Sequence, residues 1–304
     1  MFGGKGGVGK TTCAAATALH YASMGEETIV ISTDFTPSLR DIFEFECSGK
    51  PAKVMEGLYV AEIGYEEVKE LWDKKFGSEV YEIFSTFVDI SYEEFVDFVV
   101  TILPGIRDEF MVDYIKELAE SGKFERIVWD TAPAGQTLGL LRMPSLVNQH
   151  LNLAPRIYSA LKTTRKRRQS VLGVIKGWEE LSNKDIAFLK NGVAFNLVTI
   201  AEGLSVRQLD SMITEFRDHS FDIDRIIINQ VVEEPDSEFL HSKARMQQDY
   251  ILEVESRYGI NVTRLPLFPH EIKGMGRLKE VQRILFGDEG KPGLESLREL
   301  GPFC

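Results

Sequence analysis

The 304-residue sequence has little cysteine, no excess of positive charge and no long apolar run. Its cysteines, Cys13, Cys47 and Cys304, are scattered and lack metal-ligand spacing, as expected for ordinary thiols of a reducing compartment. The formal net charge of −12 argues against nucleic-acid binding, which favours a basic face. No window reaches the roughly 18 apolar residues of a membrane span, and no signal-peptide pattern opens the chain. We therefore expect a cytoplasmic protein with no nucleic-acid partner.

Strand-like and helix-like segments alternate along most of the chain. Short apolar runs predict strands at 28–33, 58–62, 126–130, 193–199, 223–229 and 260–265. Helical patterns lie between them, at 107–121, 204–216 and 238–258, with two longer helical regions at 65–101 and 144–190. Such alternation predicts an α/β fold with a mostly parallel sheet flanked by helices. We expect residues 1–304 to form a single domain, into which the two helical regions are inserted.

A phosphate-binding loop opens the chain. The residues from Gly4 to Thr11 fit the pattern G-x-x-x-x-G-K-[ST] and lead into an alanine-rich helical stretch. Glycines let the backbone N–H groups turn inward toward phosphates, and the positive end of the following helix faces the same anion. Lys10 is expected to reach the β- and γ-phosphates, and the Thr11 hydroxyl to bind Mg²⁺. The predicted nucleotide-binding residues here are Gly4, Gly6, Gly7, Val8, Gly9, Lys10, Thr11 and Thr12.

Two aspartates each follow a predicted strand. Asp34 ends the strand at 28–33, and Asp130 ends the strand at 126–130. Carboxylates at the C-terminal ends of parallel strands, near such a loop, hold Mg²⁺ or the attacking water. Asp130 and Gly135 also have the D-x-x-x-x-G spacing of a γ-phosphate sensor, which adds Pro133 and Gly135 to the predicted site.

The short segment before the loop is unusual. Phosphate loops follow a buried strand of about five residues, yet only Met1 and Phe2 precede Gly3. We expect either that the natural chain starts further upstream or that the sheet lacks its central strand, and we favour the first.

The motifs together resemble one family. The loop G-G-K-G-G-V-G-K-T-T, the segment I-S-T-D followed by Ser38, Leu39, Asp41 and Phe43, and the segment D-T-A-P-x-G-x-T-L from Asp130 are similar to the arsenical pump ATPases. Within that family the best match is the branch that targets tail-anchored membrane proteins. Further matching segments are Leu103-Pro104-Gly105, Ile228-Asn229-Gln230, Arg245-Met246-Gln247 and Leu265-Pro266-Leu267.

The resemblance implies a role for each matching residue. Asp34 orients the hydrolytic water, Asp130 holds Mg²⁺ through water, and Asn229 and Pro266 flank the adenine of ATP. Lys5, a second lysine inside the loop, marks the deviant form of the motif, in which it reaches the nucleotide of the second protomer. The resemblance thus implies a homodimer that closes on ATP and opens after hydrolysis.

The sequence departs from the family pattern at several positions. Phe35, Thr36 and Pro37 replace the usual Pro-Ala-His, and Gln136 stands where histidine is common. Many targeting members carry a Cys-x-x-Cys that binds zinc between protomers, but residues 235–241 contain no cysteine. We therefore expect ATP and Mg²⁺ as cofactors and no zinc.

The two helical regions correspond to the client-binding part of the family. The first contains aromatic and branched clusters at 81–88 and 95–100, which suit a groove for an apolar helix but would also suit packing on the nucleotide domain. Neither region contains methionine, which such grooves often use. A basic run at 162–168 is either a solvated helix face or a contact for anionic headgroups or an acidic partner. Among partners, the resemblance also leaves room for a membrane receptor.

Three functions remain open at this point. The first is an ATPase that captures a hydrophobic tail-anchor helix and delivers it to a membrane. The second is the ATPase subunit of a metalloid efflux pump, which needs clustered thiols as soft ligands and finds only the three scattered cysteines. The third is a general ATP-dependent holdase chaperone that uses the same apolar surface.

Overall fold

The computed structural model describes residues 1–34, 38–45, 51–85, 89–96, 104–131, 139, 141–142, 145–146, 149 and 165–287. Within these residues eight strands form one sheet in the order β3-β4-β2-β5-β1-β6-β7-β8. Every neighbouring pair is parallel except the edge pair β3–β4. The strands are β1 Phe2–Gly4, β2 Thr28–Ser32, β3 Ala52–Met55, β4 Leu58–Glu62, β5 Arg126–Asp130, β6 Phe195–Ile200, β7 Ile223–Val231 and β8 Asn261–Pro266.

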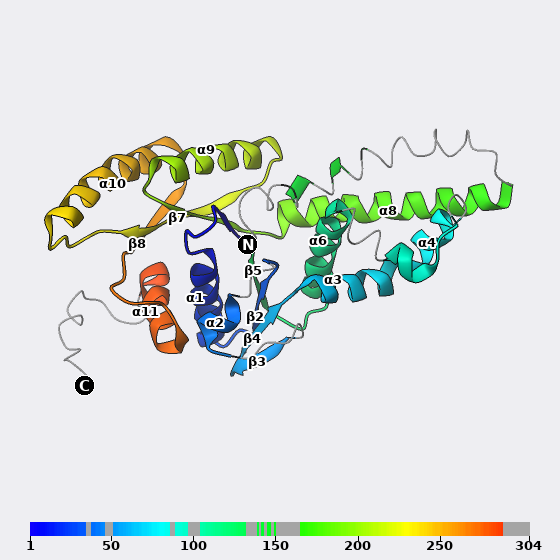
Figure 1. Ribbon diagram of the computed structural model, residues 1–304, viewed down its shortest axis with the longest axis horizontal. Coiled ribbons are helices and arrows are strands. Elements are labelled where there is room, and N and C mark those ends of the chain that lie inside the picture. The colour runs from blue at the N-terminus through cyan, green and yellow to red at the C-terminus, as the bar shows by residue number, and fades with distance from the viewer. Residues whose placement is uncertain are drawn as a thin grey trace.

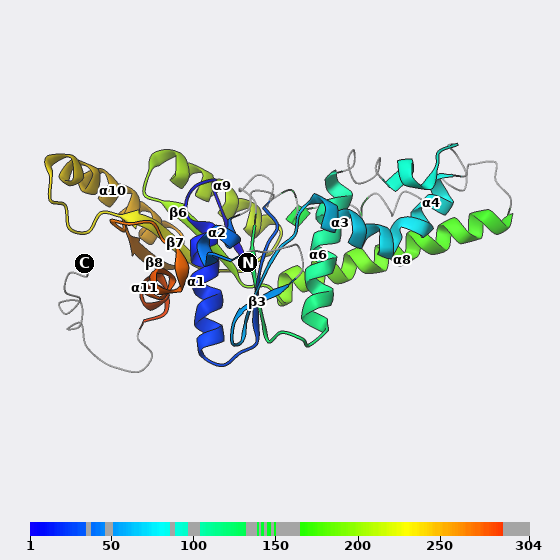
Figure 2. The same cartoon turned by 60° about the horizontal axis from the view of Figure 1, so that its bottom comes forward.

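Helices cover both faces of the sheet (Figures 1 and 2). Because side chains alternate along a strand, Val30, Val128 and Ile227 face one layer, while Ile29 and Ile31 face the other. The first layer contains α1 (Lys10–Ser23), α2 (Leu39–Phe43) and α11 (Gly274–Phe286). The second contains α6 (Pro104–Glu120), α9 (Gly203–Asp218) and α10 (Glu238–Arg257). The predicted α/β fold with a mostly parallel sheet is confirmed.

A helical extension projects from one end of the sheet (Figure 1). It consists of α3 (Tyr65–Trp72), the π-helical turn η1 (Asp73–Gly77), α4 (Ser78–Phe84), the start of α6 and the long helix α8 (Arg165–Asn191). These elements fall within or beside the two helical regions predicted from sequence; most of 144–164 lies outside the described residues. Within the described chain, no helix is long and apolar enough to cross a membrane.

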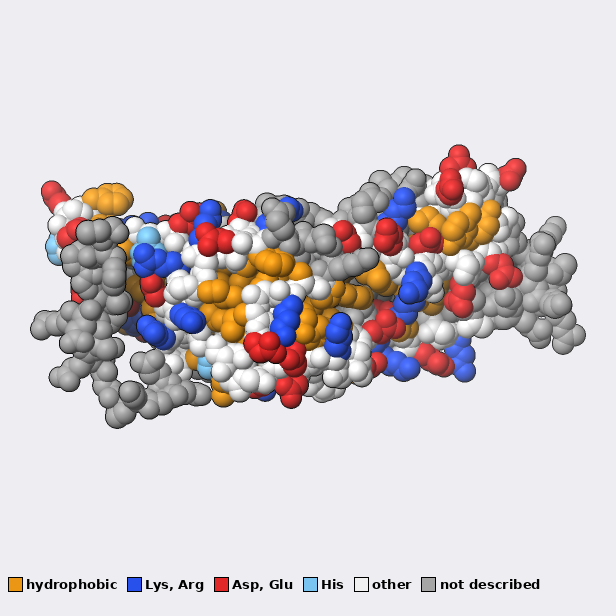
Figure 3. Space-filling model, turned by 90° about the horizontal axis from the view of Figure 1, so that it is seen from below, with side chains coloured by type: hydrophobic (Ala, Val, Ile, Leu, Met, Phe, Trp, Pro, Cys, Tyr) orange, Lys and Arg blue, Asp and Glu red, His pale blue; other side chains and the backbone are white. Residues whose placement is uncertain are grey.

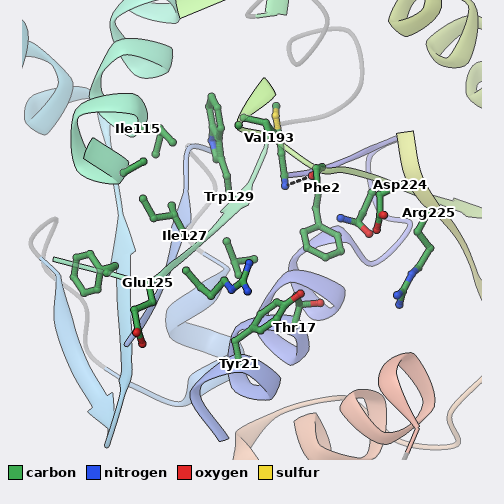
Figure 4. Close-up of a pocket in the computed structure, with 18 of the residues that line it drawn as sticks. Phe2, Thr17, Tyr21, Ile115, Glu125, Ile127, Trp129, Val193, Asp224 and Arg225 are labelled. Carbon is green, nitrogen blue, oxygen red and sulfur yellow. Dashed lines mark hydrogen bonds between the residues drawn. The ribbon is translucent and has the colours of Figure 1, made fainter. Parts of the chain in front are cut away.

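The central strand β1 is short but present, so the expectation of a sheet without it is wrong. Backbone pairing joins Phe2 to Asp130 of β5 and to Asn196 of β6. A cavity of about 300 Å³ lies at the N-terminal ends of the central strands, on the side of β1 away from the phosphate loop. It is bounded by the first residues of β5 and β6 (Figure 4). Tyr21, Ile127 and Arg225 are among its lining residues.

Three elements were not predicted from the sequence. Strand β3 forms a hairpin with β4 around Gly57, whose φ of 71° suits glycine. Helix α2 is only five residues long, too short for a periodic signal. Helix α11 buries Leu278, Val281 and Leu285, which are spaced so that they share one face of the helix.

Candidate active site

The phosphate loop joins β1 to α1 at the centre of the sheet, because the loop follows the strand directly and α1 starts at Lys10. Gly7 and Gly9 have φ values of 78° and 95°, which only glycine adopts easily. A Cβ at Gly4 would lie 2.2 Å from the Val198 carbonyl oxygen of β6. The loop glycines therefore serve two needs, namely turning the backbone and letting it pass close to β6.

The two loop lysines occupy different environments. Lys10 is almost completely buried, and its Nζ donates a hydrogen bond to the Lys5 carbonyl oxygen at 3.2 Å. Burial lowers the pKa of Lys10, while the nearby charges of Asp130 and Asp34 oppose that shift. The Lys5 side chain is only half-buried. Lys10 thus lies inside the site, and Lys5 on its rim.

Asp130 lies fully buried at the end of β5, beside Thr11 and Ser32. Burial raises its pKa to about 6, against the opposing effects of the Thr11 hydroxyl, Lys10 and Ser32. Its Oδ2 accepts a hydrogen bond from Ser32 Oγ at 3.3 Å, whereas Oδ1 is buried with no hydrogen-bonding partner among the described residues. A buried acceptor without a donor is costly, which indicates that a ligand or its water completes the site.

The donor set fits Mg²⁺. Thr11 supplies a hydroxyl oxygen and Asp130 an unpaired carboxylate oxygen, and Mg²⁺ prefers oxygen ligands from one or two side chains plus phosphates and water. Over the described ranges, no cluster of three or more His, Cys, Asp or Glu side chains is placed to hold a metal.

Asp34 follows β2 and reaches the same centre. Its backbone N–H donates to Ser32 Oγ at 3.3 Å, so one serine hydroxyl contacts both predicted aspartates. Asp34 is half-buried, and its charge acts on Lys10. Parallel strands β2 and β5 are in register at Ser32 and Asp130, which is why these residues meet.

A cavity of about 420 Å³ lies next to the loop. It is lined by Gly9 and Thr12 on one side and by Asn229 and Pro266 on another, which brings together residues predicted from distant parts of the chain. Asn229 Nδ2 donates to the Val8 carbonyl oxygen at 2.9 Å, so this side chain also fixes the loop. Pro133 and Gly135, also predicted, lie outside the described residues.

Three residues in contact with this centre received no role from the sequence. Ser32 links the two aspartates, Ser38 Oγ lies 3.4 Å from Thr11 Oγ1, and Glu62 holds the backbone at Ser38. The sequence does mark Glu62, because like Asp34 and Asp130 it is a carboxylate at the end of a predicted strand. The phosphate loop with its buried Lys10, the two strand-end aspartates and the adjoining cavity define a P-loop nucleotide hydrolase.

The chain belongs to the family of anion-transporting ATPases, whose family model matches residues 1–287. It is 29% identical to the ATPase GET3A of Arabidopsis thaliana, over 91% of this chain and 80% of that protein. A protein of Aquifex aeolicus that carries the name arsenical pump-driving ATPase 2 is also 29% identical, over 94% of this chain and 98% of that protein. A Dictyostelium discoideum homologue of the ATPase ASNA1 is 29% identical, over 93% of this chain and 88% of that protein. The chain is therefore an ATPase of this family.

Proposed function

We propose that this ATPase captures the hydrophobic helix of tail-anchored membrane proteins in its helical extension and releases it through ATP hydrolysis. The proposal rests on the family resemblance and on one structural observation, which is how the extension is attached to the phosphate site. Helix α6 leads into β5, which ends at Asp130, and α8 leads into β6, which pairs with β1. A movement at the nucleotide would thus be transmitted along two continuous connections.

At the phosphate site, the proposed roles follow the geometry. Lys10 holds the β- and γ-phosphates, Thr11 binds Mg²⁺, and Asp130 binds it through water at its unpaired Oδ1. When bound, Mg²⁺ neutralises charge on the phosphates. Asp34 orients the attacking water, and the neighbouring cavity, with Asn229 and Pro266, receives the nucleoside.

The second protomer is part of the proposal. Lys5 lies on the rim with a half-buried side chain, and in this proposal it contacts the nucleotide of a partner protomer. We therefore propose a homodimer that ATP closes, with Mg²⁺ as the metal and no zinc at the dimer contact.

We propose that the client helix binds at a cavity in the helical extension, whose lining includes the charged residues Lys75 and Glu79 as well as apolar ones. A cavity of about 440 Å³ lies between η1, α4 and α8, with Phe76, Trp178 and Leu181 on its walls. Gly173 and Gly177 are spaced one turn apart on α8, and a Cβ at either would meet no atom within 4 Å. Figure 3 shows hydrophobic side chains exposed on this end of the molecule as well. An apolar helix would cover such a surface.

The base of the extension is tied together by buried charges. Lys116 of α6 bonds Asp113 at 2.9 Å and also bonds Asp185 of α8, and Lys75 of η1 bonds Asp113. Lys116, Asp113 and Asp185 are each at most 4% exposed. This network ties α6 to α8 and to η1 at the base of the extension.

The pump function has less support from the thiols. Thiolates are the form that binds arsenite, and burial raises the pKa of Cys13 to about 12. Cys47 and Cys304 lie outside the described residues. We expect ATP hydrolysis to be insensitive to arsenite, and stimulation by arsenite would favour the pump.

The test is capture of a client with a C-terminal apolar helix, compared with the same client lacking that helix. We expect helix-dependent co-purification, followed by release on adding membranes and ATP to the wild type but not to Asp34→Asn. Equal capture of both clients would support a holdase, and capture of neither would contradict the proposal.

A groove variant sharpens the test. Gly177 lines the cavity, and a Cβ added there would meet no atom within 4 Å, so we expect Gly177→Leu to fold and hydrolyse ATP while capturing at least about tenfold less client. Ala187→Leu is the matched control, because Ala187 is exposed on the same helix and does not line the cavity. Unchanged capture by Gly177→Leu would place the client elsewhere.

A further inference from the structure

A carboxylate outside the predicted site contacts the backbone at the start of α2, the helix that comes after Asp34 in the chain. Glu62 ends β4, and its Oε1 accepts hydrogen bonds from the backbone N–H groups of Ser38 at 2.9 Å, Leu39 at 2.8 Å and Arg40 at 3.2 Å. Its Oε2 pairs with Arg40 Nε at 3.3 Å. The Glu62 side chain is only 11% exposed, so these contacts are partly shielded from water.

Sheet register explains why Glu62 is at this place. Ser32 of β2 is paired with Glu62 on one side and with Asp130 on the other, so the three residues form one row across parallel strands. Residues in one row of a parallel sheet point to the same face. Asp130 therefore meets the phosphate loop, while Glu62, two strands away, meets the start of α2.

The segment held by Glu62 contacts the loop residue that binds Mg²⁺ in our proposal. Ser38 Oγ lies 3.4 Å from Thr11 Oγ1, within hydrogen-bonding range. Leu39 and Phe43 of α2 are buried, which anchors the helix on its other side. Asp41 and Ile42 of the same helix line the nucleoside cavity. The position of α2 thus shapes both the metal end and the base end of the nucleotide site.

We propose that Glu62 is a positioning residue for ATP hydrolysis: its carboxylate holds the backbone of residues 38–40 so that the Ser38 hydroxyl stays beside Thr11 when Mg·ATP is bound. Without the acceptor, the backbone N–H groups of Ser38, Leu39 and Arg40 lose the carboxylate oxygen that all three share at the start of α2. The family assignment alone supports ATP hydrolysis, and the inference does not depend on the client.

The test compares Glu62→Ala, Glu62→Gln, Ser38→Ala and the double variant Ser38→Ala/Glu62→Ala. We expect Glu62→Ala to raise the Mg²⁺ concentration for half-maximal hydrolysis and to lower kcat, each by about tenfold or more. In Glu62→Gln the amide oxygen can still accept hydrogen bonds from these backbone N–H groups. This variant should therefore lose less kcat and need less extra Mg²⁺ than Glu62→Ala. Because Glu62 acts through Ser38, adding Ser38→Ala to Glu62→Ala should change kcat and the Mg²⁺ concentration for half-maximal hydrolysis by no more than about twofold further.

A second readout is independent of turnover. The rise in melting temperature of the ADP-bound protein on adding Mg²⁺ should shrink in Glu62→Ala and remain in Glu56→Ala, a matched control whose carboxylate is 89% exposed on the adjoining hairpin. Unchanged Mg²⁺ dependence in Glu62→Ala, or additive effects in the double variant, would overturn the inference. If Glu62→Ala does not fold, Glu62→Gln decides through the same two measurements.

Discussion

Ser32 Oγ donates a hydrogen bond to Asp130 Oδ2 at 3.3 Å, and the same hydroxyl accepts from the Asp34 backbone N–H at 3.3 Å. One fully buried serine thus connects the two strand-end aspartates, whose predicted roles differ. The link is possible because β2 and β5 are adjacent, parallel and in register at these residues. It couples the segment that begins at Asp34 to the carboxylate beside Thr11.

Removing the Ser32 hydroxyl should slow hydrolysis more than it weakens nucleotide binding. In Ser32→Ala the loop and Lys10 remain, but Asp130 loses one of its donors and Asp34 one of its contacts. We expect kcat to fall about tenfold, with the ATP dissociation constant within about threefold of wild type. Steady-state rates and equilibrium titration measure the two quantities. Ser23→Ala, at an exposed serine bonded to the Leu19 carbonyl, is the control and should match wild type.

Asp130→Asn should stabilise the nucleotide-free protein while abolishing Mg²⁺-dependent hydrolysis. Raising the pKa from 3.8 to about 6 means that the ionised form destabilises the fold at neutral pH, by on the order of 2–3 kcal/mol. Asparagine removes that charge but loses contacts, so we expect a net gain of about 1 kcal/mol in urea unfolding at pH 7.5. A loss of stability would show that the Thr11 and Ser32 contacts outweigh burial.

The same carboxyl predicts a pH dependence. The Asp130 carboxyl binds its proton more tightly in the folded state than in the unfolded state. Its unfavourable effect on the free energy of unfolding is therefore smallest below about pH 4 and largest above about pH 6. Unfolding stability of wild type minus that of Asp130→Asn should therefore fall as the pH rises between these limits. Other groups titrate in both proteins and cancel in the difference. A flat difference would contradict the raised pKa.

Gly9→Ala should damage the nucleotide site far more than Gly7→Ala. A Cβ at Gly9 would lie 2.3 Å from Asn229 Nδ2 and would displace the side chain that bonds the Val8 carbonyl, in addition to straining a φ of 95°. At Gly7, with φ 78°, a Cβ meets no atom within 4 Å, so only backbone strain of about 1–2 kcal/mol remains. We expect ATP affinity to fall at least about tenfold more in Gly9→Ala. Equal losses by equilibrium titration would rule out the Asn229 contact as the cause.

Breaking the buried charge network should loosen the helical extension. Lys116→Met leaves the Asp113 and Asp185 carboxylates buried with fewer partners, which costs about 3–5 kcal/mol. Replacing Asp185 by Leu as well should recover part of that loss, because the remaining charge is paired with Lys75. Urea unfolding measures both, with exposed Lys184→Met as the control on α8. A loss below about 1 kcal/mol for Lys116→Met would show that water reaches this network.

The sequence by itself determined the phosphate loop, the two strand-end aspartates and the α/β class. These follow from local rules: glycines that permit turning, a helix that starts at Lys10, and apolar runs that end in a carboxylate. The strand order, the row of Glu62, Ser32 and Asp130, the packing of Asn229 against Gly9 and the pairing of Lys116 with Asp185 were decided only by tertiary structure. Each of these contacts joins residues about 30 to 220 positions apart in the sequence. Local periodicity does not indicate which strands become neighbours or which charges are buried together.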